Sequence, residues 1–171
     1  MALAQTAASL SSDDFDEQTT KRMSKAAGVP AITSARAIGL AVRALGARRI
    51  ALVAPYPVPV IKLLERHYTG KYGLEVVACE SFAGTDSVMY PSIGQEQARD
   101  AIAQNDRPEG EVFVVPGGNF PTMPCISDWE RTIGKPVITT NQAALWAMLQ
   151  IMCVDEKLLG LGRLLDEMPA M

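Results

Sequence analysis

The sequence predicts an α/β protein of the doubly wound type, in which helices cover both faces of a parallel sheet. Two observations predict this class. Short apolar segments rich in β-branched residues alternate with segments whose apolar residues recur at helical spacing. A stretch near the C-terminus also repeats the turn and cap residues of an early stretch, as a duplicated unit would.

The strands and helices can be placed in order from the apolar pattern. Residues 49–54 (RIALVA) form an apolar β-branched run, and residues 57–68 carry apolar side chains at helical spacing, with the helix expected to end at Gly70. Ahead of them, residues 2–8 resemble a weak strand and residues 15–27 a helix. The remaining strands are expected at residues 74–79, 111–115 and 136–139, and the remaining helices at 93–103, 123–133 and 141–153.

An internal repeat relates residues 28–37 to residues 134–143. Five of the ten positions are identical at a constant offset, and Ser34 corresponds to Thr140. In each copy a helix should end at Gly, a short strand should follow Pro, and a hydroxyl side chain should cap the next helix. The alternative is that these turn and cap residues recur by chance, and the number of identical positions favours duplication.

The repeat implies two related lobes of unequal completeness. We expect a partial first lobe at residues 1–47, truncated at its N-terminus, a complete flavodoxin-like second lobe at 48–153, and a C-terminal segment at 154–171 that packs back toward the first lobe. A half-built lobe exposes an apolar sheet edge, so homo-oligomers are expected. Whether Met1 is the true start stays open.

Composition excludes several classes of function. The net charge is −3 and basic residues are scattered singly, so nucleic acid is not an expected partner. One histidine and three widely spaced cysteines cannot build a conventional zinc site, so no metal is expected. No apolar run is long enough to span a membrane, and the start resembles no signal peptide, so a cytoplasmic protein is expected.

Candidate site residues follow the expected strands, because ligands of open parallel sheets bind at the carboxyl ends of strands. These loops comprise residues 5–9, 55–56, 82–86 and 116–119. Two glycines before a helix can turn amide groups toward a carboxylate or phosphate, but taken alone a plain tight turn is the favoured interpretation. Tyr56, between two prolines, could donate a hydrogen bond to an oxyanion or could only cap the core.

Other reactive or aromatic side chains have plainer interpretations. Cys125 lies near a helix start, where the helix dipole could lower its pKa, but a buried, inert thiol is the simpler interpretation for it and for Cys79 and Cys153. His67 is assigned to packing or to charge compensation near a helix C-terminus. Trp129 and Trp146 are expected to pack in the core.

Several stretches together resemble the aspartate/glutamate racemase superfamily, in the branch of maleate cis-trans isomerase and arylmalonate decarboxylase. The resemblance rests on GVPAITSARAIGLAVRALGARRIALVAPY (28–56), on ERTIGKPVITTNQAALW (130–146) and on GLGRL (160–164), and it runs from about residue 3 to Leu164. It implies two pseudo-symmetric lobes, each offering a loop with a cysteine, that hold a small carboxylate between them. It implies no cofactor.

The resemblance also implies where the functional residues should lie. The first loop of the family, with its cysteine, falls on residues 5–9, so Gln5 occupies one thiol position; Gly117 occupies the other. Neither residue can act as a nucleophile or proton donor. The binding half of the site is implied to survive in Thr6, Tyr56, Gly118 and Asn119.

Two functions from different classes remain after this comparison of loops. The first is an enzyme that isomerises, racemises or decarboxylates a small mono- or dicarboxylate through an enolate-like intermediate, with Tyr56 stabilising charge and Cys125 as an unconventional proton donor. The alternative is a catalytically silent carboxylate-binding paralogue or a truncated gene product. Reaction with thiol reagents and a ligand panel would separate them.

Overall fold

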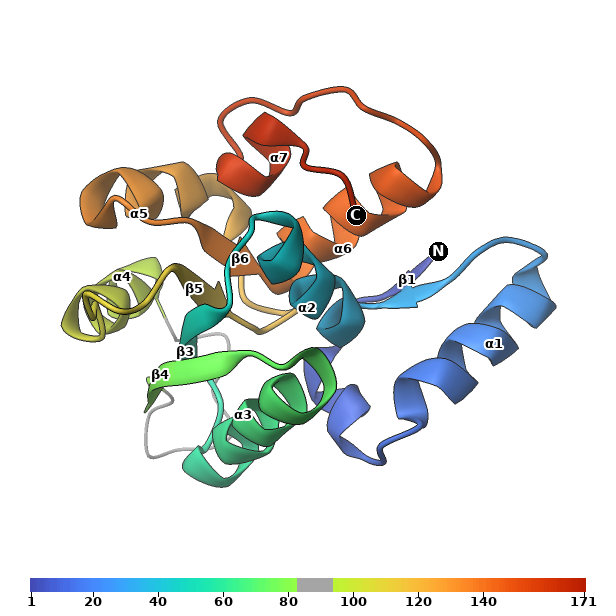
Figure 1. Ribbon diagram of the computed structural model, residues 1–171, viewed down its shortest axis with the longest axis horizontal. Helices are drawn as coiled ribbons and strands as arrows, with labels where there is room; N and C mark the ends of the chain where they lie inside the picture. Colours follow the sequence, from blue (N-terminus) through green and yellow to red (C-terminus); the bar gives the residue numbers. More distant parts are fainter. Residues whose placement is uncertain (83–93) are drawn as a thin grey trace.

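The main sheet of the protein is parallel and has four strands, with a separate pair of short parallel strands beside it (Figure 1). The computed structural model describes residues 1–82 and 94–171. The strands are β1 (Ala2–Leu3), β2 (Ile32–Thr33), β3 (Arg49–Ala54), β4 (Glu75–Ser81), β5 (Val112–Val115) and β6 (Val137–Thr139). The helices are η1 (Thr6–Leu10), α1 (Phe15–Ala27), α2 (Ser34–Ala44), α3 (Val58–Tyr72), α4 (Gln95–Gln104), η3 (Met123–Cys125), α5 (Ile126–Ile133), α6 (Thr140–Ile151) and α7 (Arg163–Glu167).

The order of the strands defines where a ligand could bind. The main sheet runs β4-β3-β5-β6, so the chain moves outward from β3 to β4 and then returns to the other side of β3 with β5. Such a reversal leaves a crevice outside the carboxyl ends of the two strands at the switch point, here β3 and β5. The predicted α/β class, with a parallel sheet and helices on both faces, is confirmed.

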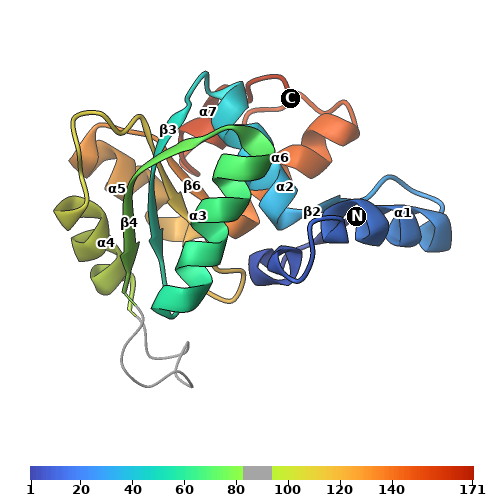
Figure 2. The same ribbon diagram turned by 60° about the horizontal axis from the view of Figure 1, so that its bottom comes forward.

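Successive side chains of the central strands point to opposite faces of the sheet, and this alternation builds a hydrophobic core on each face. Ile50 and Leu52 of β3 pack with α2, α3 and α6, whereas Ala51 and Val53 of the same strand pack with α4 and α5. Figure 2 shows the sheet between these two groups of helices. Both faces of each central strand are therefore buried, which accounts for their near-continuous apolar sequences.

The internal repeat has the same local structure in both copies. Gly28 ends α1 at φ 68° and Gly134 ends α5 at φ 72°, a left-handed conformation that glycine adopts without strain. A two- or three-residue strand and a helix follow each glycine. Thr33 caps α2 by accepting a hydrogen bond from the Arg36 amide at 3.4 Å, and the Thr139 amide donates to Gln142 Oε1 at 3.3 Å at the start of α6.

The two repeat helices, α2 and α6, pack directly against each other. Ile38 of α2 and Trp146 of α6 are fully buried in one hydrophobic cluster, which also contains residues of β3, α3 and α7. The Trp146 indole donates to the Pro169 carbonyl at 3.0 Å, which ties the C-terminal segment to α6. We propose that residues 1–47 correspond to part of one lobe and residues 48–153 to another, with this helix pair between them.

The first expected strand is shorter than the sequence indicated. The prediction of a strand over residues 2–8 is wrong beyond Leu3, because the chain turns into η1 at Thr6. The Thr6 and Ser9 side chains are buried and hydrogen-bonded there, which holds the turn against the rest of the protein.

Helix α3 is longer than expected. It passes through Gly70 and ends at Gly73, which has φ 63°. Tyr72 is the second of the two extra residues, and its ring packs where a β-carbon on Gly39 of α2 would otherwise lie. Among the described helices, none has the length and hydropathy that a membrane span requires.

Candidate functional site

A cleft of about 310 Å³ lies at the switch point between β3 and β5. Its walls come from three loops that the strand-end argument had selected: the start of η1, the turn after β3 and the loop after β5. The lining residues are Ala4, Gln5, Ala7, Tyr56, Gly117, Gly118 and Asn119. The structure therefore brings together Gln5, Tyr56 and the glycine loop although they are distant in sequence.

Tyr56 enters the cleft from the rigid turn that follows β3. The strand ends at Ala54, and Pro55 and Pro57 restrict the backbone on either side of the tyrosine. The Ser81 hydroxyl at the end of β4 donates to the Tyr56 carbonyl at 2.5 Å. The tyrosine is only 7% exposed, so its side chain has a defined position at the cleft.

The loop after β5 is shaped for glycine. Gly117 has φ 147°, and its amide donates to the Thr140 hydroxyl at 2.8 Å. At Gly118 a β-carbon would lie 2.1 Å from the carbonyl oxygen of Ala4, so no side chain fits there without moving the backbone of either loop. The Asn141 side chain donates to the Gly118 carbonyl at 3.0 Å and fixes the loop from α6.

Thr6 lies behind the cleft and does not line it. Its hydroxyl is fully buried and contacts the Ser34 hydroxyl at 3.2 Å and the Thr140 hydroxyl at 2.9 Å. Ser34 begins α2 and Thr140 begins α6, so the equivalent first residues of the two repeat helices meet at one threonine. The resemblance implies that Thr6 binds substrate. In the structure the Thr6 side chain joins the loops behind the cleft.

This junction brings two helix N-termini together at Thr6, behind the cleft, and Thr140 at the start of α6 also contacts Gly117 of the lining. The N-terminus of a helix carries a partial positive charge and attracts anions. None of the described lining residues carries a formal charge: their polar groups are two side-chain amides, a phenol and backbone groups. A small carboxylate can be held in such a setting by hydrogen bonds and helix dipoles without a cationic side chain.

None of the cysteines is among the described residues of the cleft. Cys125 lies at the start of α5 and lines a different hollow, of about 390 Å³, together with Arg99 and Asp128. Burial and the Asp128 carboxylate raise the pKa of the Cys125 thiol, a direction that agrees with the simpler interpretation of an inert thiol. Cys79 lies in β4 and Cys153 is exposed after α6.

The remaining predicted residues are placed outside the cleft. Trp129 and Trp146 are buried in the core, as expected. His67 is 9% exposed and lies in α3 next to Asp16, a contact that the sequence pattern did not indicate. Most of the loop at residues 82–86 lies outside the described residues. In the part of the chain that the structure describes, no group of three His, Cys, Asp or Glu side chains could hold a metal ion.

The fold and cleft define a doubly wound α/β protein with a cleft at the carboxyl ends of its strands that is lined by uncharged residues. Comparison with known proteins identifies the family: the arylmalonate decarboxylase family model matches residues 2–165, so the chain belongs to that family.

Two curated relatives and one solved structure give the degree of similarity. Maleate isomerase of Pseudomonas putida is 29% identical over 158 residues, which cover 89% of this chain and 63% of the relative. Arylmalonate decarboxylase of Bordetella bronchiseptica is 27% identical over 161 residues, which cover 90% of this chain and 65% of the relative. The chain thus spans less than two thirds of the length of both.

The solved structure is a variant of the maleate isomerase Iso from Pseudomonas putida S16 with maleate. It superposes with a TM-score of 0.89 at 27% identity and covers 98% of this chain and 69% of that chain.

Proposed function

We propose that the cleft between Gln5, Tyr56 and Gly118 binds a small mono- or dicarboxylate without thiol chemistry. The observation that carries the proposal is the convergence of the α2 and α6 N-termini on Thr6, behind a cleft whose lining residues are uncharged and can form hydrogen bonds. Maleate, with which the related isomerase was crystallised, has the size and charge that such a cleft favours.

Two of the lining residues, Gln5 and Gly117, explain why no thiol takes part in the proposed function. By resemblance, Gln5 and Gly117 stand where the family carries its two cysteines. A glutamine amide has no titratable proton near neutral pH and glycine has no side chain, so neither can add to a double bond as a nucleophile or protonate a carbanion. Cys125 cannot replace them from a different hollow.

Tyr56 supports a second candidate function. Its phenol can donate a hydrogen bond to one oxygen of a carboxylate, and the same bond would strengthen if an enolate-like charge developed there. Slow decarboxylation or proton exchange next to the carboxylate is the reaction class that this group could assist. Release of carbon dioxide from phenylmalonate and exchange of deuterium into phenylacetate would detect it.

Binding can be tested by calorimetry and thermal unfolding with maleate, malonate and phenylmalonate. A ligand that binds only the folded protein must raise its melting temperature. We expect a rise for the wild type, a weaker one for Tyr56→Phe, and no loss for Tyr72→Phe, which removes a phenol outside the cleft. Absence of any rise, or an equal rise in Tyr56→Phe, would overturn the proposal. Maleate should stay unisomerised in NMR spectra.

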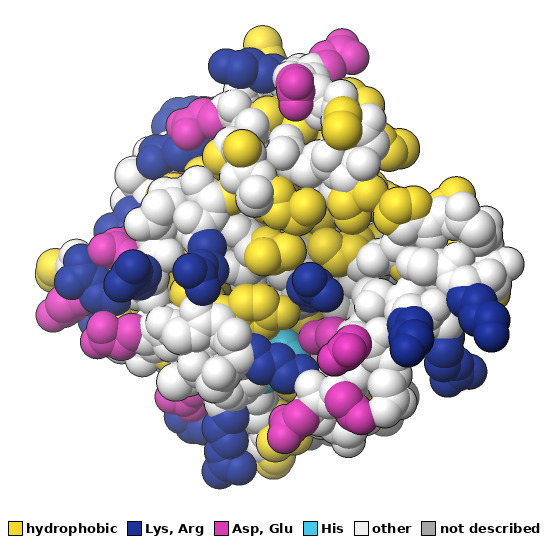
Figure 3. All heavy atoms as spheres, turned by 45° about the vertical axis from the view of Figure 1, so that its right-hand side comes forward, with side chains coloured by type: hydrophobic (Ala, Val, Ile, Leu, Met, Phe, Trp, Pro, Cys, Tyr) yellow, Lys and Arg dark blue, Asp and Glu magenta, His cyan; other side chains and the backbone are white. Residues whose placement is uncertain are grey.

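Self-association completes the proposal. Among the described strands, β1 has β2 as its single hydrogen-bonded neighbour. Figure 3 displays hydrophobic side chains gathered on one face of the molecule. A second copy of the chain would cover both features. Light scattering after size exclusion should give a mass above that of one chain, and a monomer at high concentration would contradict it.

A further inference from the structure

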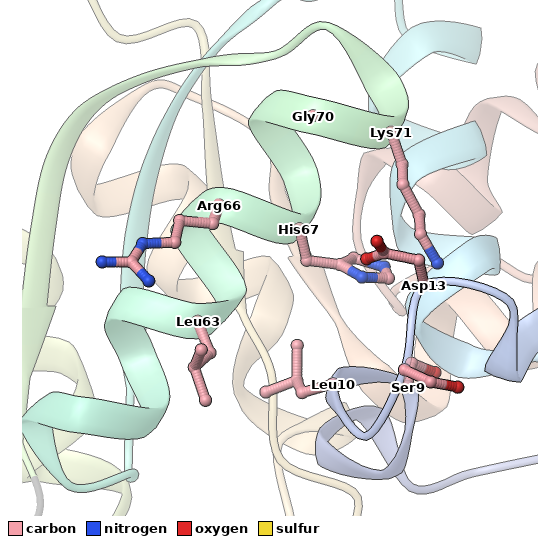
Figure 4. Close-up of a pocket in the computed structure, with 9 residues that line it drawn as sticks. Ser9, Leu10, Asp13, Leu63, Arg66, His67, Gly70 and Lys71 are labelled. Carbon is pink, nitrogen blue, oxygen red and sulfur yellow. The ribbon is translucent and has the colours of Figure 1, made fainter.

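A second hollow, of about 450 Å³, lies between α3 and the segment that joins η1 to α1. Figure 4 shows the His67 ring pointing across it toward Asp13 and Lys71, with Ser9 and Leu10 of η1 below. From outside, the single histidine is visible between cationic and anionic side chains (Figure 3). This hollow shares η1 with the carboxylate cleft, because Gln5 and Ala7 lie at the other end of the same turn.

Buried polar contacts connect η1 to α1 and α3 in this region. The Ser9 hydroxyl donates to Asp16 Oδ1 at 2.5 Å. The other oxygen, Asp16 Oδ2, lies 3.8 Å from His67 Nε2 and 3.9 Å from Lys71 Nζ. Ser9, Asp16 and His67 are 1%, 6% and 9% exposed, so all three are withdrawn from water. A buried carboxylate depends on such neighbours for its stability.

The η1 turn is therefore fastened at two points. Near its start the Thr6 hydroxyl contacts Ser34 and Thr140, and near its end the Ser9 hydroxyl contacts Asp16. We infer that Ser9, Asp16 and His67 are positioning residues, which hold the η1 turn and thereby set the carboxylate-binding cleft. The link to ligand affinity rests on the proposed function, whereas the fastening of η1 does not.

The charges around His67 make this fastening sensitive to pH. The charged groups that face His67 are Asp16 of α1, Asp13 of the segment before α1, and Lys71 of α3 itself. The rings of Tyr68 and Tyr72 pack against the imidazole. Arg66 lines the same hollow. Burial lowers the pKa of His67, Lys71 lowers it further, and Asp16 and Asp13 oppose these effects.

The direction of the pH effect follows from proton linkage. The pKa of His67 is below its ordinary value in the closed arrangement, so an opened arrangement with a solvated imidazole binds the proton more tightly. Acidification through the usual range of histidine should therefore release η1 and weaken ligand binding, and the fastening should be complete above that range.

A ligand-free experiment tests the fastening itself. Hydrogen exchange of the amides of residues 6–10 should be on the order of 10-fold faster in Asp16→Ala than in the wild type, because Ser9 loses its acceptor. Asp16→Asn keeps an acceptor oxygen for Ser9 and should restore most of the protection. The matched control is Glu17→Gln, which removes the same charge from an exposed neighbour on α1. Equal exchange in all four proteins would overturn the inference.

A pH titration of affinity tests the link to the cleft and remains usable if Asp16→Ala does not fold. Between about pH 7.5 and 5.5, the Kd for maleate should rise roughly 3- to 10-fold more in the wild type than in His67→Gln. The titration of maleate itself is common to both proteins and cancels in the ratio. Identical profiles would overturn the link. Failure of the wild type to bind any carboxylate would overturn the proposed function alone, and the exchange data would still decide the fastening.

Discussion

The hydroxyl groups of Thr6 and Thr140 lie 2.9 Å apart although 134 residues separate them in the chain. Thr140 begins α6, and its repeat equivalent, Ser34, begins α2 and contacts the same threonine. A single buried side chain thus joins the two repeats where their helices start. The cleft walls on both sides depend on this junction, because Thr140 also accepts the amide of Gly117.

Replacing Thr140 by valine should reveal how much the junction contributes. The variant keeps the shape of the side chain, but the Gly117 amide loses its hydrogen-bond acceptor and the Thr6 hydroxyl loses one of its two hydrogen-bond partners. Leaving a buried donor unpaired costs about 1–3 kcal/mol. Urea denaturation should show a loss of that size, and Thr140→Ser should lose much less. A fully stable Thr140→Val would mean that the junction carries little energy.

Two glycine-to-alanine substitutions should change stability in opposite directions. In Gly118→Ala the new β-carbon would lie 2.1 Å from the Ala4 carbonyl, so one loop must move, at a cost of about 1–3 kcal/mol. Gly70 lies within α3 with open space around it, and Gly70→Ala should stabilise the protein by about 0.5–1 kcal/mol. Thermal unfolding of both variants checks this pair, and equal effects would contradict the packing argument.

Glu111 should make the thermal stability of the protein fall more steeply at acidic pH than it does in a variant without this carboxylate. Its carboxylate accepts hydrogen bonds from the Arg48 and Arg49 amides and from the Arg49 guanidinium, which lower its pKa to about 2. Stability from a depressed carboxyl pKa is present above the ordinary value, near 4.5, and is lost as the pH falls toward 2. Wild-type melting temperatures should fall more steeply over this range than those of Glu111→Gln.

The control for the acid series is Glu109→Gln, which neutralises an exposed carboxylate two residues away. Its melting temperature should follow the wild-type curve. Parallel curves for all three proteins would show that the hydrogen bonds to Glu111 add no stability.

The three thiols should differ in their rates of reaction with iodoacetamide. Burial raises the pKa of Cys79 to about 11, and burial together with Asp128 raises the pKa of Cys125, so few of these thiols ionise near neutral pH. Cys153 is exposed and should be labelled first. Mass spectrometry of tryptic peptides measures each rate, and maleate should protect none of the three. Rapid, maleate-protected labelling of Cys125 would instead return it to the site.

The sequence was sufficient for those features that depend on local chemistry. Apolar runs predicted β3 and β5, and the rule that ligands bind at strand ends selected the loops around Tyr56 and Gly117 before any geometry was known. The repeat paired Ser34 with Thr140 because equal offsets preserve equal places in the fold. These features follow from periodicity and turn residues alone.

Contacts between segments that are distant in the sequence cannot be predicted from local sequence patterns. Asp16 belongs to a polar, acidic stretch of the sequence, yet it is buried and contacts Ser9 and His67. The predicted end of α3 at Gly70 is wrong because no local pattern shows that the Tyr72 ring, two residues further on, packs against Gly39. The burial of Thr6 likewise depends on partners 28 and 134 residues away.

The packing of α2 on α6 has a consequence for how the chain can come apart. Side chains from both sides of the junction at residues 47 and 48 share one hydrophobic cluster. Cleavage there would sever the backbone without separating two self-sufficient bodies, and heat should melt the whole molecule in one cooperative step. We therefore expect the two proposed lobes to fold and unfold as one unit.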